Sequence, residues 1–240
     1  MAEHVELIVG QGEIGKAVRE AVCPDASVYD LNGGVDGDFS HDYDVMHVCF
    51  PFSEDFVRFV GEYMDRWKPK YVAIWSTVPI GTTKACGLNV VHTPVEGKHP
   101  KLAKSIKLMP RWVGYNQPST RDFFSEYFEG KGFEARLVEN SDCTEALKLL
   151  STTEYGVNLV YADYKKRVAD AIGMDYELTK SWNTDYNELY QQLEMPQFQK
   201  FVLDPPNGVI GGHCVRENSI LLNTQFHDIL LDRIIGMQKP

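Results

Sequence analysis

The sequence lacks the features that would point to a membrane, to secretion or to nucleic acids. It has no apolar run of the roughly 18 residues that a membrane-spanning helix needs. Its first residues, Met1 to His4, carry no basic stretch of the kind that opens a signal peptide. It also has no Lys/Arg-rich run, and its formal net charge is −10. Because phosphate backbones are bound by clustered positive charge, nucleic acid is not expected as a main partner.

The cysteines lack the pattern of a disulfide framework or of a structural metal site. They are five in number, an odd count, and no two of them form a Cys-x-x-Cys pair. They are widely spaced, at Cys23, Cys49, Cys86, Cys143 and Cys214. We therefore expect free thiols, no bound metal and a cytoplasmic protein.

The N-terminal part alternates short apolar segments with segments of helical character. Strands are predicted at residues 5–9, 27–30, 45–50, 71–75, 89–92, 111–114 and 134–138. Alternation of this kind predicts an α/β fold, a Rossmann-like doubly wound parallel sheet, over residues 1–139. Residues 33–44 are rich in glycine and aspartate and are predicted to form a solvated loop.

A glycine-rich loop joins the first predicted strand to the first predicted helix. Its residues are Gly10, Gln11, Gly12, Glu13, Ile14 and Gly15. In a dinucleotide site, the first glycine makes a tight turn, the second lets the backbone reach a pyrophosphate, and the third lets helix pack on strand. Asp30 follows Gly10 by 20 residues, where an acidic side chain binds the adenosine ribose. No arginine follows Asp30 directly, so NAD is favoured over NADP.

Polar and proline residues follow several of the predicted strands. Phe50 and Pro51, Ser76 and Thr77, and residues 94–96 each come directly after a strand or close to its end. Ligands of doubly wound sheets bind outside the carboxyl ends of the strands. Phe50, Pro51, Ser76 and Thr77 are therefore predicted to line the cofactor site.

Residues 140–240 are predicted to form a helical domain with one long helix. Core-facing residues recur at helical spacing from Ala146 to Ile172, about eight turns, and the helix is predicted to end at Gly173. Its wide apolar surface predicts a homodimer interface. Lys148, in its first turns, is either a surface lysine with a buried stem or a functional cation. Shorter helices are predicted at 176–194 and 217–237.

A glycine cluster surrounds one cysteine just before the last predicted helix. The stretch reads Gly211-Gly212-His213-Cys214. Glycines allow close backbone approach, and a helix N-terminus stabilises a thiolate. Cys214 is therefore predicted to be a reactive thiol, and an ordinary glycine loop is the alternative.

In sequence order, these motifs resemble the UDP-glucose/GDP-mannose dehydrogenase family. The matching pieces are the glycine loop, the run from Ser76 to Thr83, the helix with Lys148, and Gly-Gly-His-Cys. The resemblance implies NAD as cofactor and two successive oxidations of one alcohol carbon, through a cysteine thiohemiacetal and then a thioester. It also implies that Cys214 is the nucleophile, that Lys148 stabilises the oxyanion, and that Thr77 holds a water molecule.

The chain departs from the family pattern at several points. Asn218 stands where the family has a catalytic aspartate, and Thr152 stands where it has an asparagine. Glu96 matches the family's general base only with a shift of one position. The family also has a third domain that binds the nucleotide, so the chain resembles a truncated form without it.

The sequence thus predicts an NAD-dependent oxidoreductase that uses Cys214. Its substrate would be a small molecule, either a nucleotide sugar or a smaller alcohol or aldehyde. One alternative is an NAD-binding or regulatory protein that has lost turnover, which the Asn218 departure favours. Another alternative is one subunit of a split dehydrogenase.

Overall fold

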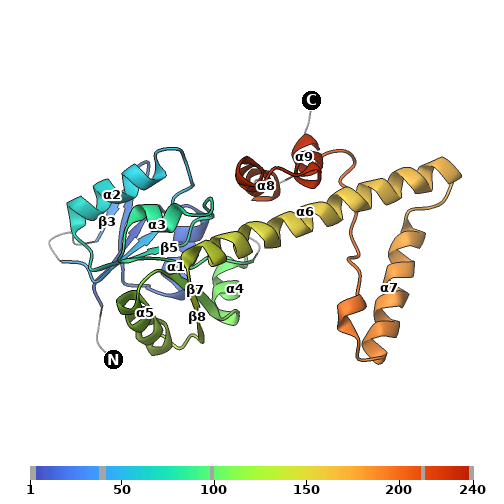
Figure 1. Cartoon of the computed structure of the whole chain (residues 1–240). Helices are drawn as coiled ribbons and strands as arrows, with labels where there is room; N and C mark the ends of the chain where they lie inside the picture. The colour runs from blue at the N-terminus through green and yellow to red at the C-terminus, as the bar shows by residue number, and fades with distance from the viewer. Residues whose placement is uncertain (1–3, 38–41, 98–99, 212–213, 238–240) are drawn as a thin grey trace. The chain divides into compact units, whose positions relative to one another are not determined.

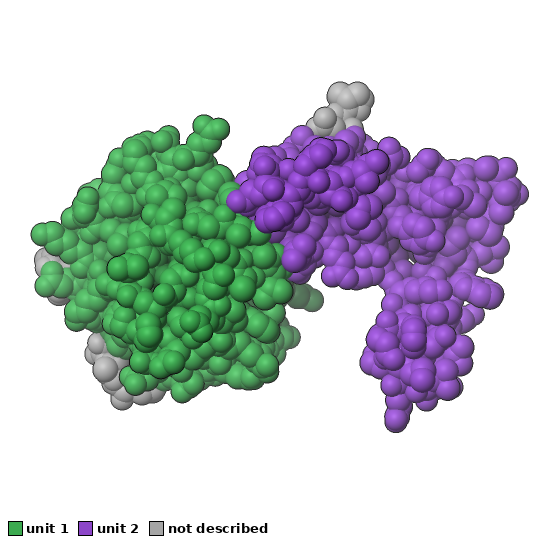
Figure 2. Space-filling model, viewed as in Figure 1, with its two compact units in different colours: residues 1–148 green, residues 149–240 purple. Residues whose placement is uncertain are grey.

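The chain forms two compact units, residues 1–148 and residues 149–240 (Figure 2). The structure is a computed structural model that describes residues 4–37, 42–97, 100–211 and 214–237. The division between the units falls within the long helix. The predicted domain boundary, between residues 139 and 140, lies before that helix begins.

The first unit is built on an eight-stranded sheet in the order β3-β2-β1-β4-β5-β6-β7-β8 (Figure 1). The strands are β1 (Glu6–Val9), β2 (Ser27–Asp30), β3 (Gly34–Asp36), β4 (Val45–Val48), β5 (Tyr71–Ile74), β6 (Val90–His92), β7 (Arg111–Tyr115) and β8 (Ala135–Glu139). Neighbouring strands are parallel except at the pairs β2–β3 and β6–β7. The predicted doubly wound α/β sheet is confirmed. The order in which successive strands are added reverses between β1 and β4, where such sheets bind ligands.

Helices cover both faces of this sheet. They are α1 (Glu13–Ala21), α2 (Phe56–Trp67), α3 (Thr82–Cys86), α4 (Leu102–Leu108) and α5 (Pro118–Gly130). Successive strand residues point to opposite faces, so Ile8 joins one buried cluster with side chains of α1, α4 and α5. Leu7 and Val9 join the other cluster, with side chains of α2. Both faces of β1 are therefore buried, which explains its continuous apolar run.

Three short elements were not predicted. β3 lies in the segment expected to be a solvated loop, and all three of its residues are exposed. Helices α3 and α4 have five and seven residues. Elements of this length show too few apolar repeats for the sequence period to reveal them.

The long helix is α6 (Ser141–Ile172), as the spacing predicts. It begins after Asn140, which has φ 79° and whose Oδ1 accepts a hydrogen bond from the backbone N–H of Asp142. Asn140 is therefore the residue that caps the helix. The helix ends at Gly173, which has φ 70° as expected for a glycine C-terminus.

Several large apolar side chains of α6 are exposed in the second unit. Among them are Tyr161, Tyr164, Val168 and Ile172. They supply the apolar surface on which the homodimer prediction depends, and the homodimer stays a prediction. Among the described residues, no helix combines the length and the apolar character that crossing a membrane requires.

The rest of the second unit contains α7 (Glu177–Gln192), a short 3-10 helix η1 (Pro196–Phe198), α8 (Cys214–Gln225) and α9 (Ile229–Gly236). The single helix predicted at 217–237 is wrong, because the chain breaks between α8 and α9. Asp228 causes the break, since its side chain accepts a hydrogen bond from the N–H of Leu230 and caps α9. The two helices then pack against each other.

Candidate functional site

The three motif glycines of the loop between β1 and α1 have three different environments. Gly10 has φ +99°, and a Cβ there would lie 2.8 Å from the backbone N of Phe50. A Cβ on Gly15 would lie 1.9 Å from the carbonyl oxygen of Gly10, so α1 can pack on β1 only with glycine there. A Cβ on Gly12 would meet nothing within 4 Å. The loop is thus closed at Gly10 and Gly15, where the backbone leaves no room for a side chain. It is open at Gly12, where a ligand can approach.

The N-terminus of α1 faces this open position. Gly12 is its N-cap residue, and no side chain caps the helix. Glu13 and Ile14 form the first turn, with Glu13 exposed and Ile14 half-buried. An uncapped helix N-terminus is a ready site for a phosphate group. These residues fit the pyrophosphate of a dinucleotide.

Asp30 is fixed at the end of β2, beside the loop. Its Oδ2 accepts a hydrogen bond from the N–H of Gln11 at 2.6 Å, and its Oδ1 accepts from Asn32 and Gly33, each at 2.9 Å. The backbone hydrogen bond from Gln11 is the largest cause that lowers the pKa of Asp30. The carboxylate is therefore charged and held at the edge of the loop, where it could accept from a ribose hydroxyl.

The carboxyl ends of β1, β4 and β5 meet beside the glycine loop. The Ser76 hydroxyl, which follows β5, donates to the carbonyl oxygen of Phe50, which follows β4, at 2.6 Å. Phe50 also contacts Gly10, as the short Cβ distance indicates. Pro51 is exposed and Thr77 is half-buried, one residue further along each connection. The structure thus brings the predicted cofactor residues of three strands together, while their binding role stays a prediction.

Lys148 and Glu96 form an ion pair within the first unit. Lys148 Nζ lies 3.3 Å from Glu96 Oε2, and the side chains are 15% and 32% exposed, respectively. A lysine with a buried stem and a solvated head would extend into water, whereas this one meets a carboxylate. The pair holds a positive charge close to a possible proton acceptor. Catalysis by either group stays a prediction.

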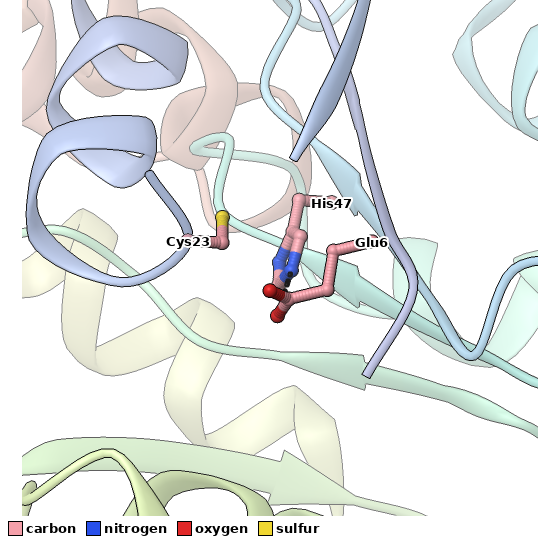
Figure 3. Close-up of side chains that lie close together, drawn as sticks. All are labelled: Glu6, Cys23 and His47. Atoms are coloured by element: carbon pink, nitrogen blue, oxygen red, sulfur yellow. Dashed lines mark ion pairs between the residues drawn. The ribbon is translucent and has the colours of Figure 1, made fainter. Parts of the chain in front are cut away.

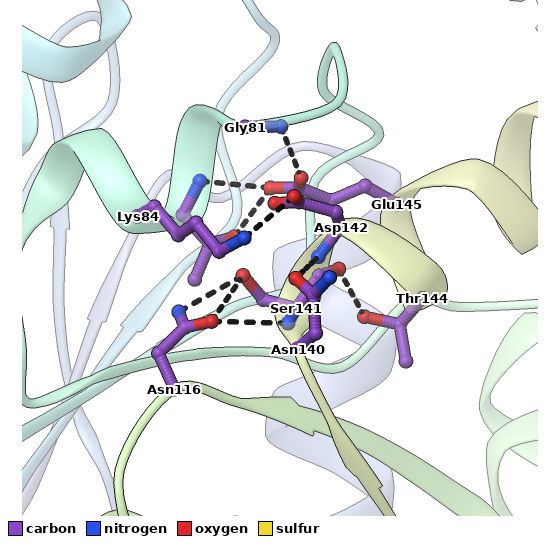
Figure 4. A network of polar contacts seen from close by, with 9 residues as sticks. Gly81, Lys84, Asn116, Asn140, Ser141, Asp142, Thr144 and Glu145 are labelled. Carbon is purple, nitrogen blue, oxygen red and sulfur yellow. Dashed lines mark hydrogen bonds and ion pairs between the residues drawn. The ribbon is translucent and has the colours of Figure 1, made fainter.

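Glu145, one turn before Lys148, fastens α6 to the loop after β5 (Figure 4). Its carboxylate accepts hydrogen bonds from the N–H of Gly81 at 2.6 Å, and from the N–H and hydroxyl of Thr83 at 2.8 and 2.6 Å. Burial raises the pKa of Glu145, and these hydrogen bonds offset part of that shift. The loop that carries Thr77 and the helix that carries Lys148 are therefore held as one piece.

His92, at the end of β6, makes a second connection between the same loop and helix. Its Nδ1 lies 2.9 Å from the Thr144 hydroxyl, and its Nε2 lies 3.3 Å from the carbonyl oxygen of Ser76. Burial lowers the pKa of His92 to about 3, and the charge of Lys148 adds to the effect. His92 is therefore neutral at pH 7 and has a positioning role.

The neutral state of His92 makes the folded chain sensitive to acid. Its ordinary pKa of 6.5 is lowered to about 3 on folding, so below pH 6.5 the unfolded chain binds a proton that the folded chain does not. We expect its contribution to stability to be complete above pH 6.5. It should be lost as the pH falls toward 3, by up to about 1.4 kcal/mol per pH unit. Urea unfolding at pH 7.0, 6.0 and 5.0 measures the slope.

The matched comparison uses two histidine variants. A His92→Gln variant should show a flatter dependence of unfolding free energy on pH between 7 and 5. His227, whose side chain is 76% exposed, serves as the control, and His227→Gln should keep the wild-type slope. Equal slopes for all three proteins would contradict a neutral buried His92.

Cys214 is the first residue of α8, in the second unit. Its side chain is exposed, as is Gly211, whereas Gly212 and His213 of the motif lie outside the described residues. The start of α8 packs tightly on α6, because a Cβ on Gly156 would lie 2.8 Å from Val215 Cγ1 and 2.9 Å from Ile234 Cδ1. The thiol thus stands at an anchored helix N-terminus, as predicted. Its reactivity stays a prediction.

Asn218 and Thr152 form a bonded pair. The Asn218 side-chain amide donates to the Thr152 hydroxyl oxygen at 3.1 Å, and Asn218 is 6% exposed. These are two positions at which the sequence departs from the family pattern. An amide cannot accept a proton as a carboxylate does. The pair therefore provides a second anchor between α8 and α6 but no base.

Among the described residues, one group combines metal-ligand side chains: Glu6, Cys23 and His47, whose ligand atoms lie within 4.8 Å of one another (Figure 3). The indole N–H of Trp75 donates to His47 Nδ1 at 3.0 Å. That hydrogen bond uses Nδ1, and Nε2 lies 3.2 Å from the Tyr127 hydroxyl, so both ring nitrogens already have protein partners. Burial also raises the pKa of the Cys23 thiol well above its usual value.

The same cluster has a structural explanation. The Tyr127 hydroxyl of α5 donates to Glu6 of β1 and lies 3.2 Å from Nε2 of His47. Lys131, the residue after α5, pairs with the Glu6 carboxylate at 3.1 Å. These contacts fasten α5 to the first residue of β1 and to His47 of β4. They are a polar part of the core and lie away from the glycine loop.

Sequence reasoning missed Glu145 and His92. The sequence assigns no role to Glu145, and it predicts His92 only as the end of a strand. The one signal in the sequence is that Glu145 lies near the start of a helix predicted to face the core. A carboxylate that is buried there requires hydrogen-bond partners. The partners themselves lie 62 to 64 residues away and could not be identified.

The fold and site together define a class of structure. The fold of this chain, with its Rossmann-type sheet, its glycine loop at the switch point and its long helix leading into a helical unit, is similar to that of solved nucleotide-sugar dehydrogenases. The resemblance predicted from the motifs is thus confirmed at the level of the fold. No protein-family model and no curated protein matches the sequence.

Three solved structures illustrate this similarity of fold. UDP-D-ManNAc dehydrogenase from Pyrococcus horikoshii matches 97% of this chain with 68% of its own, at 17% identity and a TM-score of 0.75. For UDP-N-acetyl-mannosamine dehydrogenase from Staphylococcus aureus, the match covers 97% of this chain and 67% of that protein's chain, at 14% identity and a TM-score of 0.71. For 3-hydroxyisobutyrate dehydrogenase from Mycobacterium tuberculosis, the match covers 98% of this chain and 92% of that protein's chain, at 12% identity and a TM-score of 0.64. The chain thus spans about two thirds of the nucleotide-sugar dehydrogenases.

Proposed function

We propose that the chain is an NAD-dependent oxidoreductase of the kind that oxidises an alcohol or aldehyde carbon. The observation that carries the proposal is the glycine loop. It is closed at Gly10 and Gly15, open at Gly12, and flanked by the fixed Asp30 carboxylate. That combination fits a pyrophosphate and a ribose hydroxyl, and a 2′-phosphate would meet the Asp30 charge. When bound, NAD supplies the hydride acceptor.

In this proposal, the side chains of the two units have distinct roles. The Cys214 thiol adds across the aldehyde C=O, sulfur to carbon and proton to oxygen, and forms a thiohemiacetal. When that carbon gives up its hydride and the hydroxyl proton passes to Glu96, a thioester is left, which water cleaves to the acid and the free thiol. Lys148 stabilises the oxyanion that develops at the carbonyl oxygen. Glu96, paired with Lys148, acts as the general base, and Thr77 orders the attacking water.

Asn218 determines how far such a reaction proceeds. The family's aspartate at this position is replaced by an amide bonded to Thr152, so one proton acceptor is missing. We infer that a two-electron oxidation, of an aldehyde through the Cys214 thioester, is favoured over the full four-electron reaction. The substrate class extends from nucleotide sugars to smaller alcohols. Similarity to 3-hydroxyisobutyrate dehydrogenase over most of both chains supports including the smaller ones.

The second candidate function is a dinucleotide-binding regulatory protein without turnover. The Asn218–Thr152 hydrogen bond favours it, because it uses two positions next to Cys214 and Lys148 for packing. Both functions require NAD at the glycine loop. A screen for NAD reduction with UDP-sugars, sugar phosphates and simple alcohols separates them. Reduction with any of these supports the enzyme, and binding without reduction supports the regulatory function.

Cofactor choice is the direct test of the site. With NAD at about 100 times its dissociation constant, we expect a stabilisation of about 2.7 kcal/mol, which raises the melting temperature by several degrees. The same concentration of NADP should give little or no shift, since its 2′-phosphate faces the Asp30 carboxylate. Thermal unfolding with each nucleotide measures this difference. Equal protection by NAD and NADP would remove the role assigned to Asp30, and protection by neither would remove the dinucleotide site.

A further inference from the structure

A cavity of about 470 Å³ lies within the second unit, and none of the residues assigned to the dinucleotide site or to catalysis lines it. One face of α6 forms one wall, through Asn158, Tyr161 and Lys165. The other wall comes from α7 and from residues 199–203, which follow η1. Its volume falls in the range of small-molecule sites, which is about 300 to 1,000 Å³.

The wall formed by residues 199–203 is fixed to α7 by hydrogen bonds. Asn187 donates to the Lys200 carbonyl at 2.8 Å and accepts from the Lys200 N–H at 2.7 Å. The Asn183 side chain donates to the Phe201 carbonyl at 2.9 Å, and the Tyr176 hydroxyl donates to the Leu203 carbonyl at 2.9 Å. The segment has no regular secondary structure of its own over this stretch. Side chains of α7 therefore hold the cavity open in a defined shape.

Two lysines of the cavity have no acidic partner within the parts of the chain that the structure describes. Lys165 and Lys200 make no ion pair there, whereas Lys180, on the same cavity, pairs with Glu177 and Asp204. Each unpaired ammonium group instead lies over a tyrosine ring: Lys165 Nζ is 5.3 Å from the Tyr161 centroid, and Lys200 Nζ is 3.4 Å from that of Tyr186. Burial and the charge of Lys200 together lower the pKa of Lys165. Two cations thus repel each other across one cavity.

From this arrangement we infer that the cavity binds a small phosphate monoester, with its phosphate between Lys165 and Lys200. A phosphate monoester carries close to two negative charges at pH 7, which matches two unpaired ammonium groups and removes their repulsion. The faces of Tyr161 and Phe201 supply apolar walls for the rest of the ligand. Asn158 and Glu154 offer polar groups to its hydroxyls. The site is separate from the glycine loop and does not depend on the proposed oxidoreductase activity.

Calorimetric titration of the full chain tests the inference with four probes: ribose 5-phosphate, uridine 5′-monophosphate, inorganic phosphate and unphosphorylated ribose. We expect at least one ester to bind more tightly than inorganic phosphate, and ribose not to bind. Lys165→Gln and Lys200→Gln should each weaken ester binding by about tenfold or more, because each removes a charged contact. The matched control is Lys166→Gln, on the same helix, where Lys166 pairs with Asp170. It should keep the wild-type affinity.

Three results would overturn the inference. One is the absence of binding by either ester at millimolar concentration. Another is an affinity that neither lysine variant changes while its melting curve stays that of the wild type. The third is loss of ester binding when NAD is added, which would assign the ester to the glycine loop. Ester binding that persists with saturating NAD supports a separate site, whatever the outcome of the oxidoreductase screen.

Discussion

A Cys214→Ala variant is expected to lose at least about a thousandfold of the substrate-dependent NAD reduction shown by the wild type. We expect so large a loss of rate because Cys214 is the proposed covalent nucleophile. Without it the thiohemiacetal cannot form, and only substrate binding and electrostatic stabilisation still contribute to catalysis. The thiol is exposed at the first residue of α8. Initial rates at saturating NAD, with the best substrate of the screen, measure the loss.

The control for this experiment is Cys143→Ala. Cys143 is the other exposed cysteine among the described residues, and it lies in the first turn of α6. It should keep wild-type activity, and both variants should keep wild-type NAD affinity. Activity that survives in Cys214→Ala would remove the covalent mechanism. It would leave a two-electron alcohol dehydrogenase that uses Lys148 without a thiol.

Features set by local spacing were predictable from the sequence. The glycine loop could be located because its turn, its open position and its tight packing each require glycine at a fixed offset. The long helix could be located because apolar residues recur at helical spacing from Ala146 to Ile172, within the 32 residues of α6. The start of α8 near Cys214 was likewise predictable. In each case, the deciding interactions lie within a few residues along the chain.

Features set by distant partners were not predictable. Glu145 and His92 join the loop after β5 to α6, and their partners come from other elements. The break between α8 and α9 depends on whether Asp228 caps a helix or sits in one, which the apolar stripe does not reveal. Thr152 and Asn218 were two separate departures in the sequence. Only the fold joins them, across 66 residues, into one hydrogen-bonded pair.

The second large effect is expected from adding a single carbon to Gly15. In a Gly15→Ala variant, the Cβ would lie 1.9 Å from the carbonyl oxygen of Gly10 and 3.4 Å from Cys49 Cβ. The first contact is with backbone, so α1 or the loop has to move. We expect a loss of about 3 kcal/mol or more in unfolding free energy. NAD binding should be lost as well, since the displaced loop is the binding surface. Urea unfolding and nucleotide titration measure the two effects.

A Gly12→Ala variant tests NAD binding without disturbing the fold. Gly12 has φ −70°, which alanine adopts without strain, and its Cβ would meet no protein atom within 4 Å. Its unfolding free energy should therefore stay within about 0.5 kcal/mol of the wild type. Its affinity for NAD should fall by about tenfold or more, because the methyl group occupies the space through which a pyrophosphate reaches the backbone. If Gly12→Ala binds NAD as the wild type does, the open position faces only solvent, and the loop serves packing alone.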